Sequence, residues 1–394
     1  MLFRVRFLGQ ATILLLVVVC LILLSGWREV KPLVVVVPSP QLQPPPQPHP
    51  PSSLHLSLEN RNIENEDDDD SVNTEQQILP EQEVVPLDPR ENDLLYRPPL
   101  EVAFIFTHAR DSYPLQNKLR VAVSTLLAAS SAPLRLHLIT DQDGFHIASQ
   151  IIRRAQETNQ LDSRYVKVSS DPYLRLGCIS NEDSVTILQE FFTRRTNAYY
   201  RDALFFFSLH LHKLLQGLDR VILMDIDIKV KGDIAELHSH FERFSPSNVI
   251  GMTLEQSSVY RHVLSAYRKK HPNTTFGSPA TQGGFPGFNS GVVLVDINKL
   301  RKSDIIRKYL SKSKLIEKTT YYSFQGHLGD QDLYTLIALD HPELFYTIPC
   351  GWNRQLCTWW RDHGYRTVFD QYFNCTEEFK ILHGNCKTPI PDDL

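Results

Sequence analysis

Two aspartates one residue apart, Asp225 and Asp227, directly follow the apolar run Val221–Met224. Residues two apart in a strand point to the same face, so both carboxylates can converge on one point. Two negative charges at the end of a buried strand need a partner, and a divalent cation would supply one while leaving coordination positions for phosphate. The motif therefore predicts a metal-phosphate site. The alternative is a strand that simply emerges into a polar loop.

An aspartyl phosphatase is a second chemistry that places two aspartates after a buried strand, with the first as nucleophile. Such enzymes usually carry Thr or Val two residues after the second Asp, where this chain has Lys229. Their motif also lies near the start of the domain, whereas more than 120 residues of the expected folded part precede Asp225 along this chain. We therefore favour the metal interpretation.

The elements that position these carboxylates are those of an α/β sheet. Apolar runs of the kind buried on both faces of a mostly parallel sheet occur at Val102–Phe106, Leu134–Ile139, Val221–Met224, Val249–Met252 and Val292–Val295. Between them, helical length and amphipathic spacing occur at Lys118–Ala129, Ala203–Gln216, Val259–Lys269 and Asn298–Leu310, the last with a start signal at Asp296. We predict a Rossmann-like, mostly parallel sheet flanked by helices, with ligands at the carboxyl ends of the strands.

The first 95 residues differ from the rest in composition. Residues 7–27 carry no charge and are long enough to cross a bilayer as a helix, which predicts a transmembrane signal anchor preceded by a cytosolic tail of residues 1–6. A cleaved signal peptide is the alternative. Residues 28–95 contain no Phe, Tyr or Trp and predict a disordered, Pro-rich and then acidic stem. Residues 96–394 remain for a catalytic domain.

We expect a single-pass type II protein of the endoplasmic reticulum membrane with a lumenal catalytic domain, and the Golgi is the alternative location. The acidic balance belongs to the stem, because Glu59–Asp93 carries 13 acidic and 2 basic residues. From Leu94 onward the charge is 35 minus 31, or +4. So weak a charge argues against a nucleic-acid partner, although it can accommodate a nucleotide. Oligomerisation stays open.

Four of the six cysteines, Cys350, Cys357, Cys375 and Cys386, cluster near the carboxyl end. An even cluster in a membrane-tethered domain favours two disulfides over a zinc site, because the spacing lacks CxxC pairs. Spacing does not determine which cysteines pair. Among the three pairings we take Cys350 with Cys375 and Cys357 with Cys386 as the working hypothesis.

Four motifs in order resemble glycosyltransferase family 8. They are Asp225-Ile226-Asp227, Phe288-Asn289-Ser290-Gly291-Val292, Gly329-Asp330-Gln331-Asp332 and His383-Gly384-Asn385-Cys386-Lys387. The resemblance spans roughly Glu101 to Pro389 and implies a GT-A type fold and a metal-dependent, retaining glycosyltransferase. The anchor, the aromatic region Phe191–Phe207 and the carboxyl-terminal Trp and Cys pattern are similar to those of xylose-transferring members. That similarity implies UDP-xylose as donor, and an α1,3 linkage to the xylose of a xylose-glucose unit on EGF-like repeats such as those of Notch.

The resemblance also implies a role for individual residues. Asp225, Asp227 and His383 match the ligands of Mn²⁺, with Mg²⁺ as the alternative. Implied contacts with the donor are made by Phe106, Thr107, His108, Ile226, Asn289, Ser290, Gly291, Asp330, Gln331, Asp332, Gly384, Asn385 and Lys387. Asp225 and Gln331 are implied to be catalytic. As a helix start, Asp330 also has an ordinary capping explanation.

Candidates for acceptor binding are His327, Leu328 and Trp359, because aromatic faces and small polar groups suit sugar stacking. The implied position of Gln331 is beside the anomeric carbon. Double displacement with retention requires a carboxylate nucleophile, and an amide is a poor one, so we favour attack from the face that UDP leaves. Two alternatives stay open: the donor is UDP-glucose or UDP-galactose, or the protein is a non-catalytic lumenal glycan binder.

Overall fold

The computed structural model describes residues 98–161, 166–168, 183–193 and 202–392. The chain divides into two units, Met1–Pro86 and Leu87–Leu394, and every described residue belongs to the second. The predicted tail, membrane span and stem lie outside the described residues, as does Cys178. Among the residues that the structure describes, no helix is both long enough and apolar enough to cross a membrane.

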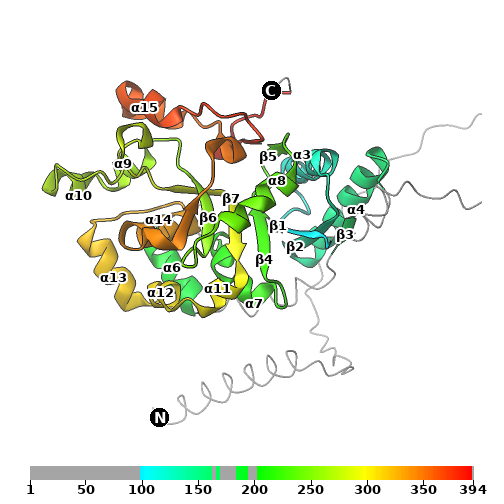
Figure 1. Cartoon of the computed structure of the whole chain (residues 1–394), viewed down its shortest axis with the longest axis horizontal. Helices are drawn as coiled ribbons and strands as arrows, with labels where there is room; N and C mark the ends of the chain where they lie inside the picture. Colours follow the sequence, from blue (N-terminus) through cyan, green and yellow to red (C-terminus); the bar gives the residue numbers. More distant parts are fainter. Residues whose placement is uncertain (1–97, 162–165, 169–182, 194–201, 393–394) are drawn as a thin grey trace, which may run out of the picture. The chain divides into compact units, whose positions relative to one another are not determined.

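A seven-stranded sheet forms the centre of the second unit, in the order β3-β2-β1-β4-β7-β6-β8 (Figure 1). Neighbouring strands are parallel except at β7, which runs antiparallel to β4 and β6. The strands are β1 (Leu100–Phe106), β2 (Leu134–Thr140), β3 (Val166–Val168), β4 (Arg220–Met224), β6 (Ile250–Leu254), β7 (Phe288–Asp296) and β8 (Phe345–Thr347). The predicted mostly parallel α/β sheet is therefore confirmed.

All five predicted apolar runs are strands of this sheet. Their hydrophobicity does not indicate the direction in which each strand runs, as β7 shows. Successive residues of β4 enter opposite cores, Val221 and Leu223 one and Ile222 and Met224 the other. A central strand covered on both faces is apolar throughout whichever way it runs. The antiparallel course of β7 was therefore not visible in its sequence.

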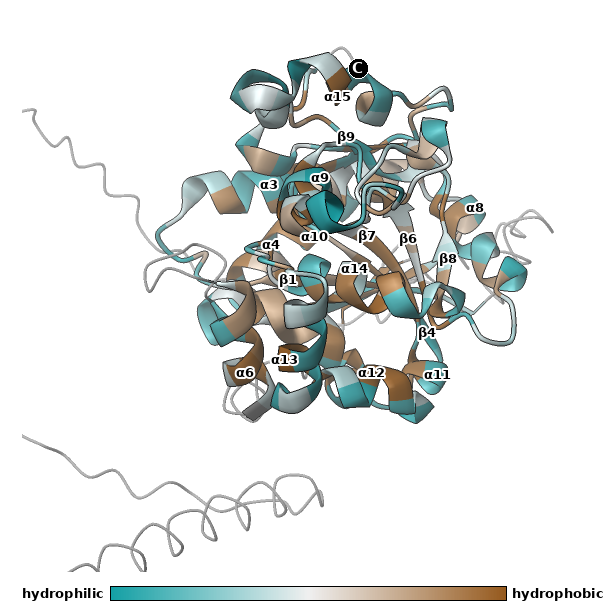
Figure 2. Ribbon diagram, turned by 90° about the vertical axis from the view of Figure 1, so that its left-hand side faces the viewer, coloured by the Kyte–Doolittle hydropathy of each residue, from teal (hydrophilic) through white to brown (hydrophobic). Residues whose placement is uncertain are grey.

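Helices cover both faces of the sheet. One core joins α3, α4 and α8 to the sheet, and the other joins α6, η2, α7 and α9 to α14. Figure 2 shows the strands at the centre largely in apolar colours. The helical segments are α3 (Tyr113–Ala129), α4 (Gln142–Thr158), α6 (Asp183–Phe192), η2 (Ala203–His210), α7 (Leu211–Leu214), α8 (Ile234–Ser239), η3 (His240–Arg243), α9 (Val259–Val263), α10 (Ser265–Lys270), η4 (Ala280–Gln282), α11 (Ile297–Lys302), α12 (Asp304–Tyr309), α13 (Lys312–Tyr321), α14 (Asp330–Asp340), η5 (Pro342–Leu344), η6 (Cys350–Asn353), η7 (Arg361–Tyr365), α15 (Arg366–Phe373) and η8 (Asn385–Lys387).

Three of the four predicted helices are broken into shorter pieces. The stretch 203–216 is a 3₁₀ segment, η2, followed by the single turn α7. The stretch 259–269 divides at Leu264, and the stretch 298–310 divides at Ser303. Ser303 Oγ accepts a hydrogen bond from Ile306 N at 3.3 Å, so it caps a second helix inside the predicted one.

A second, three-stranded sheet lies beside the end of β4. It contains β5 (Ile228–Val230), β10 (Ile381–His383) and β9 (Arg354–Gln355), with β10 in the middle. β10 is antiparallel to β5 and pairs His383 with Ile228. This sheet therefore places residues near the carboxyl end of the chain against the residues that follow β4.

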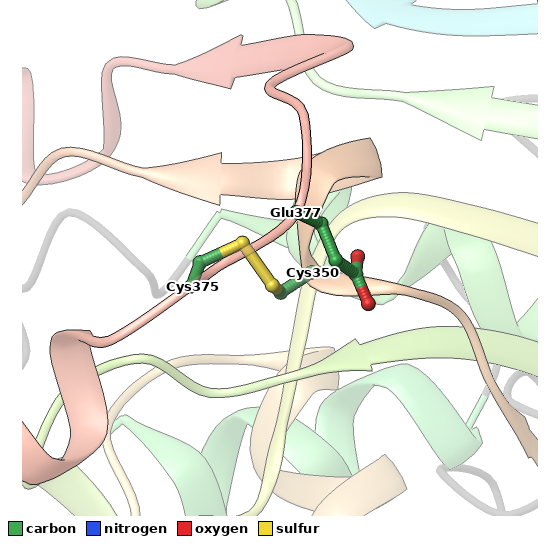
Figure 3. Close-up of side chains that lie close together, drawn as sticks. All are labelled: Cys350, Cys375 and Glu377. Carbon is green, nitrogen blue, oxygen red and sulfur yellow. A yellow bond between two sulfur atoms is a disulfide. The ribbon is translucent and has the colours of Figure 1, made fainter.

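Both predicted disulfides are confirmed. Cys350 bonds to Cys375 and Cys357 bonds to Cys386, with Cα atoms 5.9 and 5.6 Å apart. Figure 3 shows the first of them with Glu377, whose carboxylate accepts a hydrogen bond from Gly351 N at 3.0 Å. These three residues lie close enough to suggest a metal cluster, but sulfurs bonded to each other are not thiolate ligands.

The predicted helix start at Asp296 is confirmed and can be tested. Its Oδ1 accepts a hydrogen bond from Lys299 N at 2.9 Å. Asp296→Ala should lower the free energy of unfolding by about 1 kcal/mol in urea denaturation, because the amide loses its partner. Asp296→Asn keeps an oxygen acceptor and should cost only a few tenths of a kcal/mol. Equal losses in the two variants would contradict the capping role.

Candidate active site

A cavity of about 330 Å³ opens at the edge where β1, β4 and β6 end. Because β7 runs the opposite way, its first residues reach the same edge. The cavity is lined by Phe106, Thr107 and His108 after β1, Asp225, Ile226 and Asp227 after β4, Glu255 after β6, Asn289 and Ser290 of β7, Asp330 and Gln331 of α14, and His383 of β10. Its size is in the range of small-molecule sites.

Asp225, Asp227 and His383 converge at this cavity. Their ligand atoms all lie within 4.8 Å of one another. His383 Nε2 is 3.4 Å from Asp225 Oδ2 and 3.4 Å from Asp227 Oδ1. Two carboxylate oxygens and one imidazole nitrogen form a donor set that suits Mn²⁺ or Mg²⁺, so the residues fit a divalent cation.

The charges around this triad are mutually dependent. Burial lowers the pKa of His383, but its contacts with Asp225 and Asp227 outweigh burial and raise the pKa to about 10. Burial raises the pKa of Asp227, but His383 and then Lys118 lower it to about 2. Lys118 Nζ lies 3.1 Å from Asp227 Oδ2 and also lines the cavity. The Asp227 carboxylate is thus ionised and held by positive partners.

Gly291 and Asn353 hold the imidazole in place. A Cβ on Gly291 would overlap the His383 ring, so only glycine lets β10 approach β7 this closely. Asn353 Oδ1 accepts a hydrogen bond from His383 Nδ1 at 2.9 Å. The ring is therefore fixed from behind, with Nε2 toward the two carboxylates.

Gln331 occupies another wall of the cavity with its amide held on both sides. Its Nε2 donates to Glu255 Oε2 and to Tyr260 Oη, both at 3.3 Å, and its Oε1 accepts from Ser290 N at 3.3 Å. Glu255 Oε2 also accepts from Asn289 Nδ2 at 3.0 Å. Burial raises the pKa of Glu255.

The two aspartates beside Gln331 differ in what they contact. Burial raises the pKa of each to about 7. Asp330 lines the cavity and accepts hydrogen bonds from Ser208 Oγ and Ser290 Oγ. Its predicted capping role is not found, since Gly329 is the N-cap of α14 and no side chain caps it. Asp332 is fully buried, accepts from Leu328 N at 2.6 Å and Tyr260 Oη at 3.0 Å, and lies behind the cavity wall.

The segment after β1 carries a second sign of a ligand site. Thr107 Oγ1 is buried and has no hydrogen-bond partner among the residues that the structure describes. A buried hydroxyl without a partner is costly unless a ligand or water completes it. His108 has a φ of 56°, donates from its backbone N to Asp141 Oδ2 at 2.7 Å, and places Nε2 2.9 Å from Asp202 Oδ2.

The last group of predicted contact residues is divided, because six of them do not line the cavity. Asn385 lines it, and its Oδ1 also accepts from Leu356 N and Cys357 N at 3.0 and 2.9 Å. Gly291, Asp332, Gly384 and Lys387 are not in the cavity lining, and neither are His327 and Trp359, whereas Leu328 is. Their donor or acceptor contacts stay predictions.

Trp359, a predicted acceptor contact, and its neighbour Trp360 lie in different surroundings. Trp359 is 48% exposed and stacks on His363 with ring centroids 3.7 Å apart. Trp360, one residue on, lines the cavity instead. The sequence shows two neighbouring tryptophans but does not indicate which ring lines the cavity. That choice depends on how the chain folds here, where the irregular π-helical turn η7 follows directly.

Sequence reasoning missed three residues besides Trp360: Lys118, Glu255 and Asn353. Glu255 directly follows β6, so the rule that ligands collect after each apolar run could have found it. Lys118 is one polar residue of an amphipathic helix. Asn353 ends the short 3₁₀ segment η6 and belongs to no motif. For Lys118 and Asn353 we identify no sequence signal that distinguishes them from surface residues.

Comparison with known proteins agrees with this geometry. The family model of glycosyl transferase family 8 matches residues 109–387. Xyloside xylosyltransferase 1 of Mus musculus is 39% identical over 299 residues, covering 73% of this chain and 74% of the relative. Its Homo sapiens counterpart is 37% identical over the same length and shares. The crystal structure of mouse xyloside xylosyltransferase 1 in apo form matches with a TM-score of 0.68 and 38% identity, covering 75% of this chain and 100% of that chain.

The affinity of the triad for a divalent cation should depend on pH. The pKa of His383 is about 10, so at neutral pH the imidazole is protonated and a cation must displace that proton. Apparent Mn²⁺ affinity should therefore rise about tenfold per unit between about pH 6 and pH 8. Titration followed by the electron paramagnetic resonance signal of free Mn²⁺ measures it. His383→Gln should bind more weakly with little pH dependence, and a flat profile in the unaltered protein would contradict the assignment.

The contact between Gly291 and His383 can be tested by stability. Gly291→Ala should lower the free energy of unfolding by about 1 to 3 kcal/mol, because the new methyl group overlaps the imidazole. In a His383→Ala background the same change should cost far less, since the space is then open. Urea denaturation of the unaltered protein and the three variants of this cycle gives the coupling. Additive losses would show that the two residues do not meet.

Proposed function

The chain belongs to glycosyl transferase family 8, and from that premise we propose that it transfers xylose from UDP-xylose with Mn²⁺ as cofactor. The acceptor we propose is the xylose of a xylose-glucose unit on EGF-like repeats such as those of Notch, joined in α1,3 linkage with retention. The observation that carries the transferase chemistry is one cavity with a carboxylate-imidazole triad on one wall and the Gln331 amide on another. The choice of xylose rests on the relatives whose names specify it.

The proposed mechanism assigns the leaving group to the triad side of the cavity. Asp225, Asp227 and His383 would hold Mn²⁺, which supplies positive charge to the diphosphate when bound. Lys118 points its ammonium group at Asp227 within the same cavity and adds positive charge there. The backbone at Phe106 and Thr107 would bind uridine, where the Thr107 hydroxyl needs a partner. Stabilisation that grows as UDP departs lowers the barrier to bond cleavage.

Gln331 would lie beside the anomeric carbon and stabilise an oxocarbenium-like sugar. Double displacement requires a carboxylate nucleophile, and the Gln331 amide is a poor substitute. The carboxylate beside it, Glu255, is also disfavoured as a nucleophile, because its Oε2 already accepts hydrogen bonds from the amides of Asn289 and Gln331. The acceptor hydroxyl would then attack from the face that UDP leaves. Its proton would pass to the departing phosphate oxygen.

We also propose that the protein is a type II membrane protein of the endoplasmic reticulum with residues 96–394 in the lumen. The support is the uncharged segment 7–27 together with two disulfides in the described residues, which require an oxidising compartment.

Trp360 and Leu328 at the cavity are our candidates for contact with the acceptor sugar.

A donor panel tests the proposal. The full-length chain with a xyloside acceptor and Mn²⁺ should turn over UDP-xylose faster than UDP-glucose or UDP-galactose, and chelator should abolish turnover. Asp225→Asn should reduce turnover at least about 100-fold, with an unchanged melting curve. Preference for a hexose donor would overturn the choice of xylose. Glycan binding without UDP or cation affinity would instead identify a non-catalytic lumenal protein.

A further inference from the structure

A chain of buried hydrogen bonds runs from Gln331 to the metal triad. Glu255 Oε2 accepts from both Gln331 Nε2 and Asn289 Nδ2. Asn289 Oδ1 accepts from Asn353 Nδ2 at 2.9 Å. Asn353 Oδ1 in turn accepts from His383 Nδ1. Glu255, Asn289, Asn353 and His383 are all buried, so no solvent competes for these bonds.

The direction of the bonds from Asn289 to His383 is fixed by one backbone amide. Gly291 N can only donate, and it donates to Asn289 Oδ1 at 3.1 Å. The same oxygen of Asn289 faces Asn353, so Asn353 must donate to it from its NH₂ group. The oxygen of Asn353 then faces His383, so His383 Nδ1 must carry hydrogen. The remaining nitrogen, Nε2, is the one that faces Asp225 and Asp227.

The position of Asn353 is itself fixed by β6 and the residues that follow it. Gln256 Nε2 donates to the Asn353 carbonyl at 2.9 Å, and Gln256 N donates to Gln355 Oε1 at 2.8 Å. Asn353 Nδ2 also donates to Thr253 Oγ1 at 3.0 Å. Asn353 is fully buried. A side chain with all its polar atoms paired inside the protein is held in one orientation.

We propose that Asn353 is a positioning residue that fixes the tautomer and ring orientation of His383, and so makes Nε2 the ligand atom for the divalent cation. Metal-binding histidines are commonly oriented in this way by an acceptor on their other nitrogen, and loss of the acceptor weakens metal binding about 10- to 100-fold. Through Asn289, the same side chain also links the proposed cation ligand to the segment that would contact the donor sugar. The inference rests on the proposed cation site but not on the identity of the sugar.

The test compares three substitutions in the full-length chain by their affinity for Mn²⁺ with saturating UDP, read from the electron paramagnetic resonance signal of free Mn²⁺. Asn353→Leu removes the acceptor and should weaken affinity about 10- to 100-fold. Asn353→Asp keeps an acceptor for His383 Nδ1 and should stay within a few-fold of the unaltered protein. The matched control is Asn248→Leu, which removes another buried asparagine whose side-chain hydrogen bonds go only to backbone groups outside the cavity, and it should leave affinity unchanged.

Turnover provides a second readout that a purely structural role would not separate. Asn353→Asp places an oxygen opposite Asn289 Oδ1, where a donor is needed, so it should lower turnover while Mn²⁺ affinity is kept. Unchanged affinity in folded Asn353→Leu would overturn the proposal, as would lost affinity in folded Asn353→Asp. If Asn353→Leu does not fold, the Asn353→Asp result decides alone. Mn²⁺ binding of the predicted pattern without transfer from UDP-xylose would overturn the proposed donor and leave the role of Asn353 standing.

Discussion

The site depends on balancing negative charge at the end of a buried sheet. Asp225 and Asp227 leave β4 side by side, and Glu255 and Asp330 line the same cavity. These four carboxyl groups and that of Asp202, which also lines the cavity, repel one another unless positive or hydrogen-bonding partners face them. His383 and Lys118 partner the first pair, while serine hydroxyls and side-chain amides partner the second. Burial raises the pKa of Asp330 to about 7, so burial at this site disfavours the charged form of a carboxyl group even where hydroxyls bond to it.

The fold meets this constraint with two departures from a simple parallel sheet. β7 runs antiparallel, so the start of a central strand, rather than its end, brings Asn289 and Ser290 to the catalytic edge. The small sheet around β10 then delivers His383, because β10 pairs with β5, which begins immediately after Asp227. Backbone pairing thus sets the distance between residues that lie far apart in the chain.

The carboxyl-terminal segment is fastened at several points, which suits a segment that carries a candidate cation ligand, His383. The bond between Cys357 and Cys386 ties it beside the cavity, and Gly384 N donates to the Asp227 carbonyl at 2.8 Å. Asn385 holds the backbone of Leu356 and Cys357. A ligand set preorganised in this way loses less conformational entropy when it binds. It also explains why the segment can turn through positive φ at Cys386 and Lys387.

The sequence by itself determined the class of fold, the five central strands, the disulfide-rich carboxyl end and the family motifs, because each is a local pattern of burial period or residue type. It did not determine that β7 is reversed, that Trp360 and not Trp359 faces the cavity, or that Lys118 and Asn353 belong to the site. Strand direction, ring orientation and long-range hydrogen bonds depend on which segments pack together. Only the tertiary structure decided these, since a hydrogen bond between Asn353 and His383 leaves no periodicity in either segment.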